Sequence, residues 1–401
     1  MKILVSNIGS TSLKYRLFDF SDGKSEVLAK GGFERVTDYA ATIEEVLARL
    51  KDGGHIESVN DLAAVGFKTI MAKDISGCVE ATEEVLDAME FYSSVAPAHN
   101  PPYIAGIRQF REIMPDKPMV ALFETAFYQH TSTAAQRYAV PQEWYDLGVR
   151  RWGFHGASHK FIAERSAELL GRDDVAERAR NLYVNAGASP VDGPDLRIIS
   201  CHMGGSSSIT GIRNGVATGT SMGMSPQSGL PQNNRVGDLD SHALPFIMRK
   251  TGISADAAQE IMCQQSGLQG VSGVSNDLRD IADAAAAGNE RAQLALDLLV
   301  HQARHWIGAF YFDLNGIDAL VFTAGIGENR SPLRADICAN LENLGIKIDV
   351  EKNNNTRDTG RNNNQKKHTT RRNNSQKKNN QPEEKQKYHD KTPEEKAKRK
   401  E

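Results

Sequence analysis

The stretch RIISCHMGGSSSITGIRNG, residues 197–215, contains a complete strand–loop–strand unit. It begins with an apolar run at 198–201, passes through Gly204-Gly205 and a group of hydroxyl side chains, and turns at Asn214-Gly215. Asn-Gly supplies the positive φ that a tight hairpin needs. Glycines let a backbone approach an anion closely, and successive N–H groups with serine hydroxyls can surround it. The pattern therefore predicts two strands joined by a loop of a size that suits phosphate.

The N-terminus repeats this plan. In KILVSNIGSTSLKYRLFD, residues 2–19, an apolar run at 3–5 leads into a loop with Asn7 and Gly9, and a second strand at 13–18 leads out. Two such units in one chain indicate two similar half-domains that face a shared cleft. Two ordinary surface hairpins are the alternative, because loops rich in glycine and serine are common.

The composition divides the chain into an acidic body and a basic tail. A length of 401 residues allows two or three domains, and 39% hydrophobic with 25% charged residues suits a soluble protein. Residues 351–401 hold 16 Lys+Arg and 8 Asp+Glu, which leaves 32 and 43 in residues 1–350. The body has no basic excess, so we expect no specific nucleic-acid partner. We expect the tail to be disordered and of low complexity; non-specific binding to anions is the alternative.

The cysteines and the N-terminus favour a cytoplasmic protein. Cys78, Cys201, Cys263 and Cys338 are far apart and form no C-x-x-C, so we expect reduced thiols and not a metal cage or a disulfide framework. The first twenty residues lack a basic segment followed by a cleavable apolar core, so we expect no signal peptide. No run of about 18 apolar residues is present, and we expect no membrane span.

Strand and helix patterns alternate along the body, which predicts the α/β class. Asp38 is expected to cap a helix through Lys51, and Ser158 to cap one through Leu170. The segment 319–333 reads as a strand, a Gly325-Ile326-Gly327 loop and a helix. Ligands of open α/β sheets bind beyond the strand ends and near helix N-termini, although this glycine pair is too short for a dinucleotide fingerprint.

Three charged or titratable side chains lie in polar, glycine-containing segments. His155, between two glycines, suits a hydrogen-bond donor aimed at a developing phosphoryl charge. A metal pair with His159 and a purely structural loop contact are the alternatives. Arg235 can neutralise phosphoryl oxygens, or form a surface salt bridge with Asp238 or Asp240. Lys14 is either a phosphate contact or an exposed strand lysine.

Taken together, these segments resemble the acetate kinase family, within the acetate and sugar kinase/actin-like superfold. The resemblance spans about residues 1–350 in family order and is carried by KILVSNIGSTSLKYRLFDF, APAHNPP, RRWGFHGASHK, SCHMGGSSSITGIRNG, GTSMGMSP, NRVGDLD and VFTAGIGENR. It implies duplicated actin-like ATPase (ribonuclease H-like) domains with an interdomain cleft. It also implies transfer of the ATP γ-phosphoryl group to acetate with Mg²⁺, in a homodimer. The implied division is an acyl-substrate domain at 1–150 and a nucleotide-binding and dimerisation domain at 151–350.

The resemblance also implies roles for individual residues. His155 and Arg235 match the family's transition-state stabilisers, Asn7 a residue that helps hold Mg²⁺, and Lys14 an ATP contact. The acetate pocket corresponds to Ile70, Ala98, Phe154 and Pro226. The ATP-binding segments correspond to the phosphate loop (His202, Met203, Gly204, Gly205 and Ser206) and to two adenosine segments (Asp277, Leu278, Arg279; Gly325, Ile326, Gly327, Glu328, Asn329).

Three positions and the C-terminal segment depart from the family pattern. Lys68 stands where the family has an arginine that grips the acyl carboxylate, so the charge remains but the bidentate fork is lost. Glu124 replaces an essential aspartate, and Gly205 replaces an asparagine of the phosphate loop. Residues 353–401 lack the apolar strand and the Thr-Asn-Glu-Glu helix with which the family ends; Glu394, in a similar run, is not assigned as a ligand.

These departures leave two rivals to the acetate kinase interpretation. A kinase for propionate or butyrate is one, because Ala98 is small at a pocket position that the family often fills with leucine. A catalytically weak nucleotide-binding protein is the other, because Lys68, Glu124, Gly205 and the tail all differ.

Overall fold

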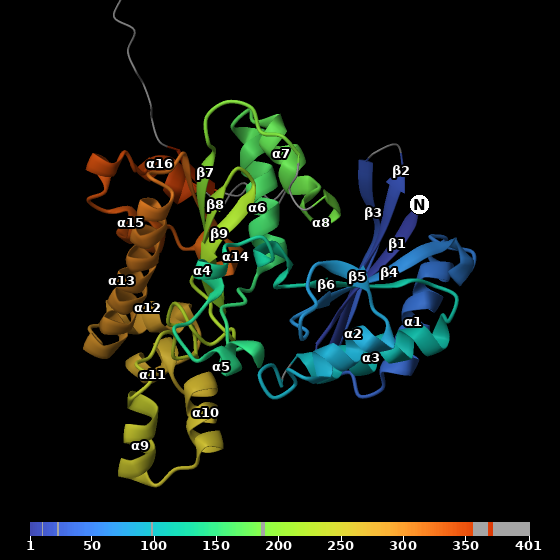
Figure 1. Ribbon diagram of the computed structural model, residues 1–401, viewed down its shortest axis with the longest axis horizontal. Helices are drawn as coiled ribbons and strands as arrows, with labels where there is room; N and C mark the ends of the chain where they lie inside the picture. The colour runs from blue at the N-terminus through green and yellow to red at the C-terminus, as the bar shows by residue number, and fades with distance from the viewer. Residues whose placement is uncertain (10, 22–23, 98, 186–188, 356–367, 372–401) are drawn as a thin grey trace, which may run out of the picture.

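The computed structural model describes residues 1–401 except 10, 22–23, 98, 186–188, 356–367 and 372–401. The chain forms two halves, each built on one β-sheet with helices packed against it (Figure 1). The N-terminal half lies on the right of the view and the C-terminal half on the left. In the part of the chain that is described, no helix combines the length and the apolar character needed to cross a bilayer.

The first sheet has six strands in the order β3-β2-β1-β4-β6-β5. Strands β1, β4 and β6 run parallel, and β2, β3 and β5 pair antiparallel to their neighbours. The strands are β1 (Lys2–Ile8), β2 (Ser12–Ser21), β3 (Lys24–Glu34), β4 (Leu62–Thr69), β5 (Cys78–Glu80) and β6 (Met119–Phe123).

The second sheet repeats the central part of the first, in the order β11-β10-β7-β8-β9. An antiparallel trio is again followed by a parallel strand, since β7 pairs antiparallel with β8 and parallel with β10. The strands are β7 (Arg197–Met203), β8 (Ser207–Arg213), β9 (Val216–Thr220), β10 (Ala319–Thr323) and β11 (His368–Arg371). The predicted α/β class and the predicted duplication of two half-domains are confirmed.

Helices cover the sheets and connect their strands. Capping follows the sequence: Asp38 accepts from the Ala41 N–H at the start of α1, as predicted. The helices of the first half are α1 (Tyr39–Asp52), α2 (Glu83–Glu90) and α3 (Asn100–Ile113); α4 (Thr133–Gln136) and α5 (Gln142–Asp146) follow β6 and lie with the second half in Figure 1. Those of the second half are α6 (Gly156–Leu169), α7 (Asp173–Arg180), α8 (Leu182–Asn185), α9 (Ala243–Thr251), α10 (Ala255–Gln264), α11 (Gly267–Ser272), α12 (Leu278–Ala286), α13 (Glu290–Asp313), α14 (Ala324–Asn329), α15 (Ser331–Cys338) and α16 (Val350–Asn354). Short 3-10 turns occur at Val59–Asp61, Ala126–Tyr128 and Glu342–Leu344.

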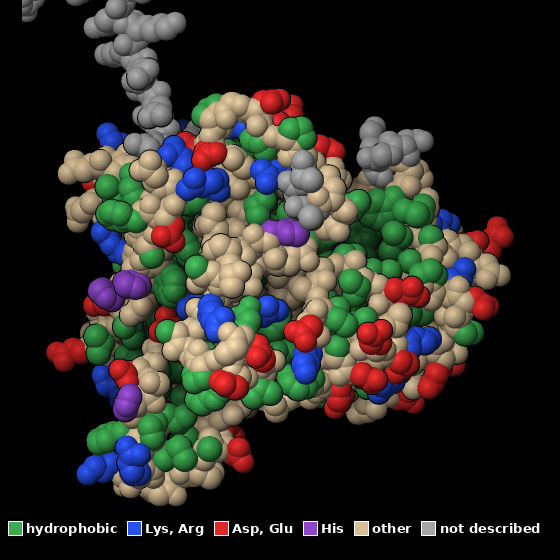
Figure 2. All heavy atoms as spheres, in the orientation of Figure 1, with side chains coloured by type: hydrophobic (Ala, Val, Ile, Leu, Met, Phe, Trp, Pro, Cys, Tyr) green, Lys and Arg blue, Asp and Glu red, His purple; other side chains and the backbone are tan. Residues whose placement is uncertain are grey.

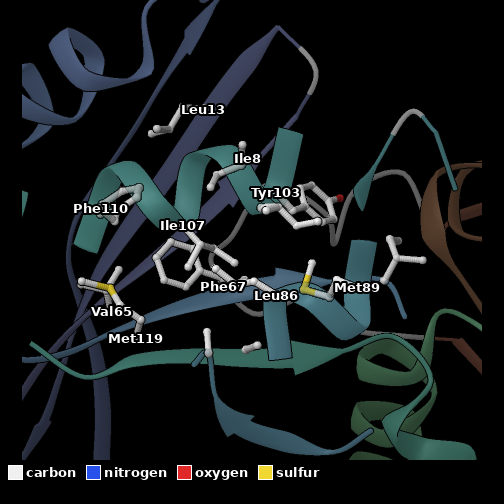
Figure 3. Packing of buried hydrophobic residues seen from close by; sticks show 14 of the residues in the cluster. Ile8, Leu13, Val65, Phe67, Leu86, Met89, Tyr103, Ile107, Phe110 and Met119 are labelled. Carbon is white, nitrogen blue, oxygen red and sulfur yellow. The ribbon is translucent and has the colours of Figure 1, made fainter. Parts of the chain in front are cut away.

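The core of the first half forms where α3 packs on the sheet (Figure 3). Ile107 and Phe110 lie on one face of α3, and the Phe110 ring meets Phe67 of β4 edge to face at 5.1 Å between centroids. Alternate residues of β4 point to this face, so Val65 and Phe67 are buried. This packing holds the carboxyl ends of β1, β4 and β6 in fixed positions beside one another.

The segment after β6 crosses to the second half well before residue 150. The Tyr128 hydroxyl donates to the carbonyl oxygen of Phe154 at 2.7 Å and lies 2.9 Å from Thr210 Oγ1 in β8. The Thr131 hydroxyl donates to the Ala217 carbonyl oxygen in β9. These contacts favour a division between the halves near Glu124, while the predicted boundary at residue 150 stays a prediction.

The tail from residue 351, which the sequence predicts to be disordered, contains two described segments with secondary structure. Helix α16 continues to Asn354, and Asn353 is buried against α15. Strand β11 pairs antiparallel with β10 at the sheet edge. Composition does not predict these two segments, because pairing of a strand at a sheet edge uses backbone groups and α16 is held by one buried amide side chain. Neither needs many apolar side chains. The rest of the predicted tail, including Glu394, lies outside the described residues.

Candidate active site

One face of the first sheet carries a row of polar side chains at the strand ends. In the β1–β2 pair, Asn7 lies opposite Lys14. In the parallel β1–β4 pair, Ser6 lies beside Phe67. Successive side chains of a strand point to opposite faces, so the side chains of the next residues, Asn7 and Lys68, lie together on the other face of the sheet. Lys14 is exposed, lies on the same face as Asn7 and forms an ion pair with Glu34 at 3.2 Å; its contact with phosphate stays a prediction.

Lys68 and Glu124, two of the three positions that depart from the family pattern, form an ion pair. Lys68 Nζ lies 2.9 Å from Glu124 Oε1, with the lysine side chain 45% exposed and the glutamate side chain 7% exposed. Burial lowers the pKa of Lys68, but the charge of Glu124 and the hydrogen bond to it outweigh burial and raise that pKa above its ordinary value. Among the described residues the second oxygen, Glu124 Oε2, is buried without a hydrogen-bond partner. One carboxylate oxygen is therefore left for a ligand.

A backbone contact brings His155 beside Glu124. The Gly156 N–H donates to the Glu124 carbonyl oxygen at 3.0 Å, and a Cβ at residue 156 would lie 2.2 Å from that oxygen. His155 takes a left-handed conformation with φ of 59° to allow this approach. The predicted start of the helix at Ser158 is therefore wrong: α6 begins at Gly156, because this inter-element bond satisfies its first N–H.

Three histidines form a cluster next to this turn. The rings of His155 and His202 stack at 4.0 Å between centroids, and His155 Nδ1 lies 2.7 Å from Ser208 Oγ. His159 is fully buried, with its ring nitrogens 2.8 Å from Ser200 Oγ and 2.8 Å from Ser208 Oγ. Figure 2 shows a histidine side chain at the surface where the two halves meet. His155 Nδ1 and both ring nitrogens of His159 therefore have serine hydroxyls as partners. Among the described residues, no three His, Cys, Asp or Glu side chains are arranged so that they could hold a metal ion.

The charge state of His155 follows from its surroundings. Burial lowers its pKa well below the ordinary value, and charges on His159, Lys68 and Arg235 act in the same direction. The imidazole is therefore neutral near pH 7 and can donate one hydrogen bond. Two of these cations, Lys68 and Arg235, come from different halves of the chain.

The phosphate loop and Arg235 meet at the end of β7. The Gly204 N–H donates to the Ser206 carbonyl oxygen at 3.1 Å, which closes the turn. Arg235 donates from one guanidinium nitrogen to Ser206 Oγ at 3.3 Å and to Gln232 Oε1 at 3.4 Å. No ion pair among the described residues includes Arg235, so the alternative of a salt bridge with Asp238 or Asp240 is wrong. Met203 points its side chain into the core, which leaves only its backbone for a ligand.

Gly205, where the family has an asparagine, lies against another asparagine. A Cβ at Gly205 would lie 3.5 Å from the amide nitrogen of Asn233. The Asn233 N–H donates to the Gly205 carbonyl oxygen at 3.3 Å. Among described side chains, Asn233 Oδ1 is buried with no hydrogen-bond partner. An amide therefore remains next to the loop, from a residue that the sequence pattern did not single out.

One residue of the predicted adenosine segments, Leu278, lines a pocket of the second half. Asp277 caps α12 and forms an ion pair with Arg279, while Leu278 lies on the pocket wall. The pocket has a volume of about 550 Å³. Besides Leu278 its lining comes from α13, α15 and the residues directly before and after α15: Gln293, Leu296, Asp297, Val300, His301, Arg304, Arg330, Pro332, Leu333, Asp336 and Ala339. We call Gly325–Asn329, which leads directly to Arg330, the nucleotide loop.

The nucleotide loop is held by its own glutamate. Glu328 Oε1 accepts from the Thr323 hydroxyl at 3.0 Å and from the Ala324 N–H at 3.2 Å. Ala324 takes a left-handed conformation, with φ of 67°. This carboxylate therefore stabilises the turn out of β10, and the other predicted residues of the loop offer backbone groups.

Two of the predicted acetate-pocket residues are adjacent in sequence to parts of the site. Ile70 and Phe154 are buried in the core of the first half, directly after β4 and directly before His155. Pro226 receives a hydrogen bond from Gln232 at its carbonyl oxygen. His99, which the sequence did not assign, has its pKa lowered to about 4 by burial, Arg235 and Lys68, so it too lies within reach of both cations. Ala98 lies outside the described residues.

Comparison with known proteins agrees with this geometry. The acetokinase family model matches residues 32–372. The acetate kinase of Alkaliphilus metalliredigens is 42% identical over 381 residues, covering 88% of this chain and 91% of that protein. The acetate kinase of Clostridioides difficile is 39% identical, with 88% and 90% covered.

Two solved structures extend the comparison. The acetate kinase of Porphyromonas gingivalis is 35% identical with a TM-score of 0.75, covering 88% of this chain and 90% of that one. A propionate kinase from Francisella tularensis is 30% identical with a TM-score of 0.75, covering 88% and 91%. With sequence, family model and structure in agreement over most of its length, the chain belongs to the acetokinase family.

Proposed function

We propose that this ATP-dependent carboxylate kinase transfers the γ-phosphoryl group of ATP to acetate, giving acetyl phosphate and ADP, through the residues gathered around His155. The observation that carries the site assignment is the contact between the halves, in which the Gly156 N–H donates to the Glu124 carbonyl oxygen. This contact places His155 beside the ion pair of Glu124 with Lys68. The lowered pKa of His155, to which Lys68 and Arg235 both contribute, agrees with it. Two cations from different halves near one neutral hydrogen-bond donor suit a transferring phosphoryl group, whose negative charge is spread over three oxygens.

The proposed mechanism is direct in-line transfer. Lys68 holds the acetate carboxylate while one of its oxygens attacks the γ-phosphorus and the bond to the ADP oxygen breaks. Arg235 neutralises charge on the equatorial oxygens, and neutral His155 donates a hydrogen bond to them. Ile70, Phe154 and Pro226 shape the methyl side of the pocket, with Ala98 as the further predicted member. Positioning and charge neutralisation supply the rate, because little covalent work is needed.

Mg²⁺ fits the oxygen donors on the first sheet. Glu124 Oε2 is buried without a partner among the described residues, and the Asn7 amide emerges on the same face. Magnesium in phosphoryl-transfer sites takes one or two protein oxygens, with water and substrate phosphates completing its shell. When bound, it would neutralise phosphate charge. Glu124 Oε1 remains bonded to Lys68 and orients that ammonium group.

The nucleotide is proposed to lie along the second sheet. Backbone groups of His202 to Ser206 contact the phosphates, and Lys14 lies near them from the first half. The adenine base enters the pocket beside Leu278, whose walls include Leu296, Val300 and Leu333. Asp277 and the nucleotide loop then lie next to the ribose.

Two broader proposals concern assembly and location. We propose a homodimer, supported by exposed apolar side chains on and near the α9–α10 arm: Leu239, Phe246, Ile247 and Ile261. Light scattering coupled to gel filtration would give the mass in solution. We propose a cytoplasmic location, since all four cysteines are unpaired thiols and a reducing compartment suits them.

The deciding experiment is acyl-phosphate trapping with hydroxylamine for acetate, propionate and butyrate, with ATP and Mg²⁺. Acetate should give the highest kcat/KM. A preference for propionate would favour the alternative that the 30% identical propionate kinase raises. ATP binding without acyl hydroxamate from any acid would favour the weak nucleotide-binding alternative.

A further inference from the structure

Helix α16 is joined to the nucleotide loop through one buried arginine. Arg334, in α15, is 2% exposed. One of its nitrogens donates to the carbonyl oxygens of Gly327 and Glu328, both at 2.8 Å. Its other nitrogens donate to Asn353 in α16, at 2.8 Å to Oδ1 and at 2.9 Å to the carbonyl oxygen. A single guanidinium group therefore connects two segments that are separate in the sequence.

Asn353 is also anchored on its other side. Its amide nitrogen donates to the Ser331 carbonyl oxygen at 2.8 Å, at the start of α15. Buried charge is stabilised only when its N–H groups are satisfied, and charge-assisted bonds are the stronger ones. Removing the Asn353 side chain leaves the Arg334 Nε donor without this acceptor, so the guanidinium group loses one of the bonds that orient it toward the loop.

The nucleotide loop has a conformation that needs such support. Ala324 at its start is left-handed, which is unfavourable for an L-residue with a side chain. Gly327 packs closely on the second sheet, where a Cβ would lie 3.5 Å from the Met203 Cβ. Strand β11 pairs with β10, which leads into the loop, so a second C-terminal element supports the same turn.

We propose that Asn353 is a positioning residue for ATP: through Arg334 it holds the carbonyl groups of Gly327 and Glu328, and with them the nucleotide loop, in the conformation that receives the nucleoside. This inference rests on the proposed function, in which the nucleotide loop contacts adenosine. It assigns a role in nucleotide affinity to the segment after residue 350.

The test uses the full chain and the run of three asparagines at 353–355. Asn353→Ala removes the side-chain acceptor of Arg334; we call this Asn353–Arg334 connection the strut. Asn354→Ala is the matched control, because Asn354 is exposed in the same helix. Asn353→Asp keeps the oxygen that accepts from Arg334. The measurements are the ATP Kd by calorimetry, KM for ATP and for acetate, kcat, and the thermal midpoint.

Asn353→Ala should raise the ATP Kd and KM about five- to tenfold, which is less than the full loss of a hydrogen bond to a charged group because the effect reaches the loop only through Arg334. Its KM for acetate should stay within twofold, Asn354→Ala should match the parent, and Asn353→Asp should recover most of the affinity. Equal ATP Kd values for Asn353→Ala and the parent would overturn the strut. A lower thermal midpoint with unchanged ATP Kd would overturn it as well, since the role would then be structural only.

Failure of the proposed function gives a different result. A parent enzyme that binds ATP but forms no acyl phosphate contradicts the kinase assignment, while the Kd comparison still decides the strut. A parent enzyme that binds no ATP contradicts both, because the loop then receives no nucleotide.

Discussion

The two sheets share one strand plan but differ in what covers them. In β2 buried and exposed residues alternate, because helices pack on one face of the first sheet and form one core there. In β8 nearly every residue is buried, because α13 packs on one face and α6 with α7 on the other. Strand β7 is also covered on both faces, because the adjacent residues Ile198 and Ile199 belong to different cores.

This difference explains where each half keeps its polar groups. The open face of the first sheet can present ionic side chains such as Lys68, which is 45% exposed. The covered second sheet must satisfy its polar atoms internally, and Ser200 and Ser208 do so by bonding His159. Around His155, the charged side chains of the ion pair therefore come from the first half, and neutral serine and histidine side chains from the second form the hydrogen bonds. Arg235 is the exception, since it brings a cation to the second half.

The largest expected effect comes from removing the guanidinium group of Arg235. Arg235→Ala should lower kcat by about 10²-fold or more, because a cation that meets charge mainly in the transition state contributes to the barrier. The ATP Kd should change far less. Steady-state kinetics with calorimetry measures both, and equal losses in kcat and in ATP affinity would make Arg235 an ordinary binding residue.

The ion pair of the first half gives a smaller, coupled effect. Lys68 and Glu124 touch at 2.9 Å, so their substitutions should act as a compensated pair. Lys68→Arg or Glu124→Asp alone should not improve acyl-phosphate formation, whereas the double variant should exceed the sum by about 0.5–3 kcal/mol of coupling. A double-mutant cycle measures this. Simple addition of two favourable single effects would mean independent losses, and would favour a weak enzyme.

The smallest effect should appear in stability and not in turnover. Burial lowers the pKa of His99 to about 4 in the folded chain, against an ordinary value of 6.5. Below pH 6.5 the unfolded chain takes up a proton that the folded chain does not, so stability falls as pH drops toward 4 and levels off below it. His99→Asn should make the dependence of the denaturation midpoint shallower between pH 6.5 and 4. His242→Asn, at an exposed position, is the control; equal slopes for both variants would contradict the prediction.

The sequence alone determined the local plan of this protein. Glycine, serine and Asn-Gly at the two strand–loop–strand units encode duplicated hairpins, and Asp38 encodes a helix start, because these depend on backbone conformation and near neighbours. The ordered motifs also carried the family, which the comparisons confirm.

Only the tertiary structure decided which distant groups meet. The Gly156 N–H reaches the Glu124 carbonyl oxygen, so the helix begins earlier than its serine cap predicts. Arg334 reaches Asn353, in a segment whose composition indicates disorder. Such contacts depend on register, burial and the approach of backbones far apart in the chain, and a single sequence has no local signal for them. Polar groups that need a partner are satisfied by whatever the fold brings near, and that is settled by packing.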